Sequence, residues 1–178
     1  LFYNIQNLIG TAGNDTLGGA AGGNSTLTGG AGADVLTGYG TNNTTNYAGN
    51  TAALTINLSN AAVGGVAARS GKGGDAEGDT YTNIQNVIGG SGSDLFIASS
   101  DTNAFNGGAG NNTVSYAGST AGVVANLNTT TGSTGDALGD TFVNIQNLTG
   151  TAFADKLTGL AAGGSILIGG CLLYTSDA

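Results

Sequence analysis

The stretch Gly-Gly-Ala-Gly-Ala-Asp-Val-Leu-Thr at residues 29–37 decides the fold, because its nine-residue pattern recurs along the chain. The pattern is Gly-Gly-x-Gly-x-Asp-x-(large apolar)-x, and residues 89–97 (GGSGSDLFI) repeat it fully. Close copies lie at 10–18 and 107–115, with weaker ones at 20–28, 38–46, 98–106, 150–158 and 160–168. Repetition at a fixed period indicates a repeat architecture rather than a single globular core.

The eighth position of these nine copies is apolar in all but one. The apolar residues are Leu17, Leu27, Leu36, Phe96, Phe105, Val114, Leu157 and Leu167, and the exception is Thr45. Side chains alternate along a strand, so each x-apolar-x triplet predicts a short strand with its large side chain facing inward. The preceding glycines permit a sharp turn with positive φ angles.

The composition also favours thin layers stacked by repetition. The chain has 178 residues, of which 35 are Gly, and it contains no Pro, Met, Trp or His. Without many large side chains, one deep core is not expected. Asp and Glu total 11 against three Lys plus Arg, for a net charge of −8. This charge favours cations as partners over nucleic acid, and no apolar stretch approaches the roughly 18 residues needed for membrane insertion.

A longer unit contains these short repeats. Asn-Ile-Gln-Asn occurs at residues 4–7, 83–86 and 144–147 as a tag, and the segments between the tags match each other at Tyr-Ala-Gly and at Gly-Asp-Ala-x-Gly-Asp-Thr. We divide the chain into a tag strand plus array at 1–46, a connector with a long loop at 59–73 within 47–82, a tag strand plus second array at 83–115, a connector at 116–143, and a tag strand plus truncated third array at 144–170. Residues 171–178, including the single Cys171, break this composition and resemble translated sequencing adapter; a genuine terminal strand is the alternative.

These motifs resemble the RTX, or hemolysin-type, calcium-binding repeats of secreted bacterial proteins, over nearly all of residues 1–170. The resemblance implies an all-β fold, a parallel β-roll or β-solenoid in short stacked arrays with β-hairpin connectors. Two nonapeptides then form one coil, and each repeat stacks on the next but one. It further implies type I secretion from a Gram-negative bacterium and a secreted, extracellular or cell-surface location, with the export signal C-terminal to this sequence.

Calcium takes about six to eight oxygen ligands, which sixth-position carboxylates and turn carbonyls of stacked coils can supply. Asp15 and Asp34 form the predicted pair with two carboxylates, whereas Asp94 pairs with Asn112. Asp155 is the fifth candidate ligand, and its partner would lie beyond the truncated third array. For each of these residues, an Asx turn that bonds its own backbone is the alternative.

Other recurring residues allow two interpretations each. Asp75, Asp79, Asp136 and Asp140 are expected to be solvated turn residues, with an extra cation site as the alternative. The tags are interpreted as the first strand of each roll rather than as a binding ladder, with Gln where many relatives carry Glu. Tyr47 and Tyr116 are expected to cover the ends of arrays, although they could stack on a sugar of a ligand.

Catalysis has little basis in this sequence. Without His, and with the one Cys in the last eight residues, neither a Ser/His/Asp nor a Cys/His apparatus can form, so we expect no enzyme. The leading hypothesis is a calcium-binding structural module of a large secreted bacterial protein that folds on calcium binding after export. Two alternatives stay open: a calcium-independent spacer or adhesin segment whose loops bind cell-surface or matrix glycans, and the secretion domain of a hydrolase with its catalytic part elsewhere.

Overall fold

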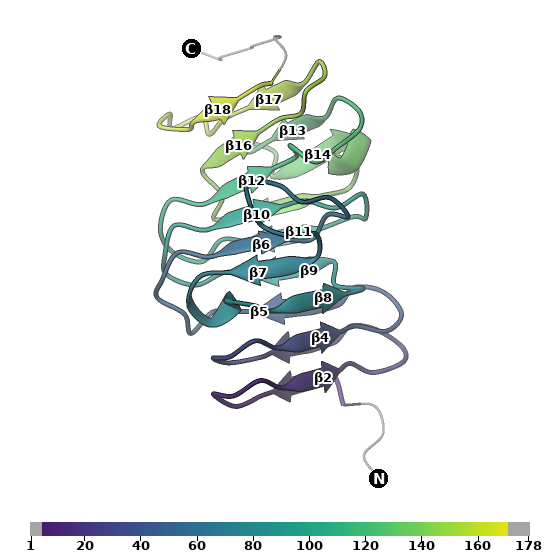
Figure 1. Cartoon of the computed structure of the whole chain (residues 1–178). Coiled ribbons are helices and arrows are strands. Elements are labelled where there is room, and N and C mark those ends of the chain that lie inside the picture. The colour runs from purple at the N-terminus through teal and green to yellow at the C-terminus, as the bar shows by residue number, and fades with distance from the viewer. Residues whose placement is uncertain (1–4, 171–178) are drawn as a thin grey trace.

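The computed structural model describes residues 5–170, so the segment 171–178 lies outside the described residues. Short strands wind into a continuous roll in which two sheets face each other, from β2 at one end to β17 and β18 at the other (Figure 1). Most neighbouring strands are parallel. The predicted all-β, parallel β-roll is confirmed.

Each sheet has nine strands among the described residues. In spatial order, sheet A contains β1 (Asn7–Ile9), β3 (Thr26–Thr28), β5 (Thr44–Asn46), β9 (Asn86–Ile88), β11 (Ala104–Asn106), β15 (Thr141–Val143), β14 (Thr131–Thr134), β13 (Val124–Asn126) and β17 (Lys156–Thr158). Sheet B contains β2 (Thr16–Gly18), β4 (Val35–Thr37), β8 (Thr80–Thr82), β7 (Ser70–Lys72), β6 (Thr55–Asn57), β10 (Leu95–Ile97), β12 (Thr113–Ser115), β16 (Asn147–Thr149) and β18 (Leu167–Ile168).

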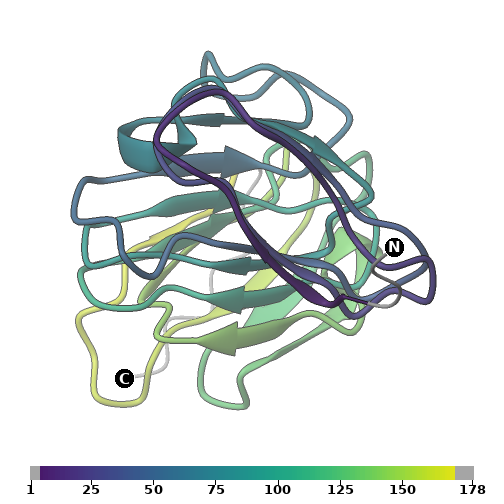
Figure 2. The same cartoon turned by 90° about the horizontal axis from the view of Figure 1, so that it is seen from below.

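Successive repeats alternate between the two sheets, so each repeat stacks on the next but one as predicted. Leu17 of β2 pairs with Leu36 of β4, and Phe96 of β10 pairs with Val114 of β12. Seen along the stack, the first coil is a flattened loop that lies across the later coils (Figure 2). Two strands and two turns therefore make one coil.

The eighth positions of the repeats form the core between the sheets. Leu27, Leu36 and Phe96 are fully buried, and the rings of Phe96 and Phe105 stack with centroids 5.8 Å apart. Thr45, the exception in the sequence pattern, is buried too, because its place in the register fixes its direction whatever its polarity. Each sheet contributes a single layer of side chains to the core.

The tags join neighbouring arrays rather than starting separate rolls. Val87 of β9 pairs with Thr45 of the preceding array, and Leu148 of β16 pairs with Val114. Each of these strands begins only at the last Asn of its tag, so the Gln before it lies in the turn. The sequence-based division into arrays and connectors thus runs across continuous sheets.

The connectors form the predicted β-hairpins. β7 is antiparallel to β6 and β8 in sheet B, whereas β14 is antiparallel to β13 and β15 in sheet A. Each also contains a short 3-10 helix, Gly74–Ala76 or Gly135–Ala137; no helix within residues 5–170 is long and apolar enough to cross a membrane. The first hairpin adds β7 to sheet B and the second adds β14 to sheet A, so the two sheets keep equal numbers of strands.

Candidate calcium sites at the turns

Two edges of the roll are built from turns. We name edge B the edge formed by turns that precede sheet B strands, and edge A the edge formed by turns that precede sheet A strands. In spatial order, the residues in the sixth position of edge B are Asp15, Asp34, Asp79, Leu54, Asp94, Asn112, Gln146 and Ser165. Those of edge A are Gln6, Ser25, Asn43, Gln85, Asn103, Asp140, Val123 and Asp155.

Sixth-position side chains tie each coil to its neighbour. The backbone N–H of Asp15 donates to Oδ1 of Asp34 at 2.8 Å, and the N–H of Asp94 donates to Oδ1 of Asn112 at 2.9 Å. Both pairs selected from the sequence therefore lie in adjacent coils. Asp155 accepts the N–H of Val123, which directly precedes the connector strand β13, at 2.9 Å.

A third carboxylate continues the stack of Asp15 and Asp34. The N–H of Asp34 donates to Oδ1 of Asp79 at 2.8 Å, and β4 pairs with β8 in parallel. We call Asp15, Asp34 and Asp79 the acidic column. The sequence did carry a signal for Asp79, because Asp79-Thr80-Tyr81 has the same Asp-x-apolar form as a nonapeptide, without its full run of glycines.

Asp34 differs from the other aspartates in its second carboxylate oxygen. In Asp15, Asp94 and Asp155, Oδ2 accepts the backbone N–H of the second residue of the same repeat, at 2.6, 3.0 and 2.7 Å. Oδ2 of Asp34 is buried without a hydrogen-bond partner. Burying a carboxylate oxygen without a partner destabilises the folded state. A hydrogen-bond donor or a cation at this atom would therefore stabilise the fold.

The turn beside Asp34 also presents backbone carbonyl oxygens. A Cβ placed on Gly30 would lie 2.0 Å from the oxygen of Thr11, and one on Gly32 would lie 2.8 Å from the oxygen of Gly13. The peptide groups of Thr11 and Gly13 thus lie directly against the turn of the next coil. Carboxylate and carbonyl oxygens are the ligands that calcium prefers.

The residues present therefore fit calcium at the Asp15 and Asp34 turns. Within the described part of the chain, no three or more His, Cys, Asp or Glu side chains are grouped to hold a metal, so carbonyls would supply much of the ligand set. The Asp94 turn has similar carbonyls, but that of Gly90 already accepts the N–H of Ala109. Asp155 accepts a further bond from the Thr151 hydroxyl, which leaves it the least free of the candidates.

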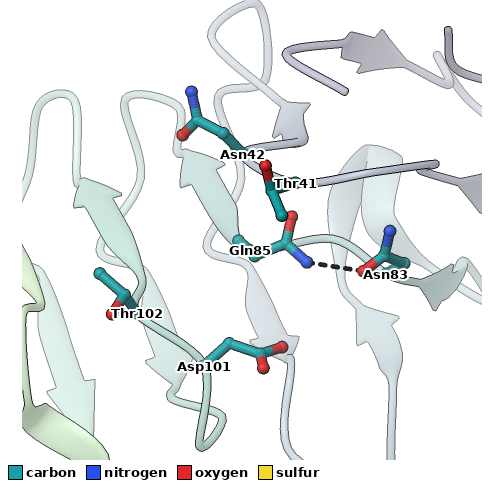
Figure 3. A pocket seen from close by; sticks show the side chains of 6 residues that line it. All are labelled: Thr41, Asn42, Asn83, Gln85, Asp101 and Thr102. Carbon is teal, nitrogen blue, oxygen red and sulfur yellow. Dashed lines mark hydrogen bonds between the residues drawn. The ribbon is translucent and has the colours of Figure 1, made fainter. Parts of the chain in front are cut away.

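Whereas the middle of edge B contains Asp79 and Asp94, the middle of edge A carries only amides. Its sixth positions are Asn43, Gln85 and Asn103, and the N–H of Asn43 donates to Oε1 of Gln85 at 3.0 Å. These turns border a hollow of about 430 Å³ (Figure 3), lined by Thr41, Asn42, Asn83, Gln85, Asp101 and Thr102. With Asp101 as its single carboxylate, this hollow suits neutral polar groups better than a divalent cation.

Asp79 and Asp140 are fully buried, so their interpretation as solvated turn residues is wrong. The hydroxyl of Tyr47 donates to Oδ2 of Asp79 at 2.5 Å, and that of Tyr116 donates to Oδ2 of Asp140 at 2.7 Å. Both tyrosines are buried, so neither can stack on a sugar. Burial raises the pKa of Asp79 to about 6 and that of Asp140 to about 7.

The fold and the turns define a class of protein, a parallel β-roll with oxygen-lined turns between its coils. Residues 19–49 and 82–114 match the family model of the RTX calcium-binding nonapeptide repeat, in four copies. These segments are RTX calcium-binding repeats, and the chain carries a calcium-binding repeat module. They contain Asp34, Asp94 and Asn112, whereas Asp15, Asp79 and Asp155 lie outside them. A search of the curated proteins found no match to the chain.

Replacing Gly30 by Ala should disrupt the stacking of the first two edge B turns. Gly30 has a φ of +98°, and its new Cβ would collide with the carbonyl of Thr11. We expect a loss of about 1–3 kcal/mol in the free energy of unfolding from backbone strain alone, measured by urea unfolding with calcium present. The control is Gly22→Ala, because a Cβ there meets no atom within 4 Å; equal losses in both variants would contradict this packing.

Acidification should stabilise the roll through Asp79 and Asp140. Their folded pKa values lie near 6 and 7, above the value of about 3.9 for an unfolded Asp. The folded state therefore takes up protons first as the pH falls, so this contribution to the free energy of unfolding rises from about pH 8 to about pH 4. Thermal unfolding at saturating calcium, compared between wild type and Asp140→Asn, should show a smaller pH dependence in the variant; an unchanged dependence would contradict the assignment.

Proposed function

We propose that the chain is a calcium-responsive structural module of a large secreted bacterial protein, which folds on calcium binding after export. The observation that carries this proposal is the buried, unpaired Oδ2 of Asp34 within the acidic column. Resemblance to repeats of exported proteins supports the extracellular setting. A structural rather than a catalytic role agrees with the matched family, which is defined by calcium binding.

The energetic basis of the response is a balance between a thin core and stacked charge. Asp15, Asp34 and Asp79 directly precede successive strands of one sheet, where neighbouring strands are about 4.8 Å apart. Like charges at such a spacing repel, most strongly where burial reduces screening. Calcium at the Asp15 and Asp34 turns would reduce this repulsion, and its binding free energy would become folding free energy.

Chelation should therefore unfold much of the roll. Residues 1–170 at saturating calcium should show the far-ultraviolet circular dichroism of a β-sheet protein, and excess chelator should remove a large part of this signal reversibly. Dissociation constants of extracellular calcium modules are about 10⁻⁴ to 10⁻³ M, so the midpoint is expected in this range. Strand content that chelator leaves unchanged would refute the proposal.

The substitution Asp34→Asn tests the acidic column directly. It keeps the side chain's size and its acceptor for the N–H of Asp15, but it removes the charge. We expect calcium affinity at this site to fall roughly 10- to 100-fold, the loss of one interaction with a charged group, measured by isothermal titration calorimetry. Asp101→Asn is the matched control, since Asp101 is exposed in the fourth position of its repeat; equal effects would overturn the register of ligands.

A second candidate function is a calcium-independent spacer or adhesin segment. The hollow lined by Thr, Asn and Gln side chains favours it (Figure 3), because hydroxyl and amide groups suit the hydroxyls of a cell-surface or matrix glycan. The same module could also accompany a hydrolase whose catalytic part lies outside this sequence. The chelation experiment separates the first two functions, since a spacer keeps its strand content without calcium.

A further inference from the structure

The two connectors contain buried carboxylates that occupy sixth positions of the roll but have different hydrogen-bond partners from those of the arrays. Asp79 precedes β8 in sheet B, and Asp140 precedes β15 in sheet A. Each receives one N–H from the adjacent coil on Oδ1, from Asp34 or from Asn103. Each Oδ2 receives a tyrosine hydroxyl. Both oxygens are thus partnered, in contrast to Oδ2 of Asp34.

We propose that Tyr47 and Tyr116 replace calcium at these two carboxylates, so that the connectors stay folded when calcium is removed. The Tyr47 lock joins Tyr47 to Asp79, and the Tyr116 lock joins Tyr116 to Asp140. This inference rests on the proposed calcium response of the arrays. It divides the roll into array turns that depend on the cation and connector hairpins that do not.

Each tyrosine joins the beginning of its connector to the end of that connector. Tyr47 directly follows β5 and Tyr116 directly follows β12, where the chain enters the connector, whereas the aspartates stand at the exit. The hydroxyl contacts close segments of 32 and 24 residues. Closing long segments costs chain entropy, and a charge-assisted hydrogen bond in a buried setting is strong enough to offset part of that cost.

The hairpins add backbone contacts that need no cation. The N–H of Gly71 donates to the carbonyl of Asp79 at 2.9 Å, and the N–H of Gly132 donates to that of Asp140 at 2.9 Å. A Cβ on Gly132 would lie 2.0 Å from the carbonyl oxygen of Ala137, so the second hairpin packs tightly on its own turn. Each tyrosine–aspartate contact therefore adds to a segment that is already held by its own backbone hydrogen bonds.

The Tyr47 lock contains one more hydroxyl than the Tyr116 lock. The hydroxyls of Tyr47 and Tyr81 are 2.7 Å apart. Since Tyr47 gives its single hydroxyl hydrogen to Asp79, Tyr81 must donate to Tyr47. Phe142 stands at the place of Tyr81 in the second connector, which leaves Tyr116 as the lone hydroxyl donor to its aspartate.

Segment-resolved hydrogen exchange with calcium and then with chelator tests this inference. In the wild type, chelator should speed exchange in the turns at 10–15, 29–34 and 89–94 while residues 69–82 and 131–143 stay protected. Tyr116→Phe, which removes one oxygen, should speed exchange at 131–143 in chelator roughly 10- to 100-fold, with calcium affinity unchanged. Tyr39→Phe is the control, because Tyr39 is exposed.

Each outcome decides one of the two proposals. Connectors that lose protection together with the arrays in the wild type, or unchanged exchange in Tyr116→Phe, would overturn the locks and leave the calcium response standing. Arrays that chelator does not affect would instead overturn the calcium response, and the exchange of Tyr116→Phe would still decide the lock. Tyr47→Phe tests the other connector independently, should Tyr116→Phe fail to fold.

Discussion

The hydrogen bond from a sixth-position N–H to a sixth-position side chain one coil further along is the contact on which the roll depends. It recurs with carboxylate acceptors at Asp34, Asp79 and Asp94 and with amide acceptors at Asn43 and Gln85. The strands are only three residues long, so ladder bonds alone give each coil few ties to its neighbour. The side-chain acceptor adds one hydrogen bond at each turn where it occurs and fixes the register.

This contact explains why carboxylates and amides can both occupy the sixth position. Both provide an oxygen acceptor, so the fold tolerates the exchange. What changes is the demand made by the rest of the side chain, since a buried carboxylate needs further donors or a cation. Asp155 finds them in Thr151, and Asp140 in Tyr116, whereas one oxygen of Asp34 has none.

The connectors are part of the same stack rather than interruptions of it. Each inserts an antiparallel hairpin between parallel strands, one in sheet B and the next in sheet A. A long unit can therefore repeat without leaving one sheet longer than the other. The length difference between the units falls in the loop between β6 and β7 and that between β13 and β14, where extra residues leave the core unchanged.

The sequence by itself determined the repeat and the inward eighth positions, because these follow from local periodicity, and its resemblance to RTX repeats implied that each repeat stacks on the next but one. It also selected Asp15 with Asp34 and Asp94 with Asn112 as neighbours. Tertiary structure alone decided that Asp79 and Asp140 bind Tyr47 and Tyr116, since those pairs are brought together by hairpins whose place in either sheet does not follow from any local pattern. The tag glutamines were likewise placed in turns only by the pairing of β9 with β5 and β16 with β12. A nine-residue period specifies what stacks on what within an array, whereas contacts across 24 or 32 residues depend on how the whole chain closes.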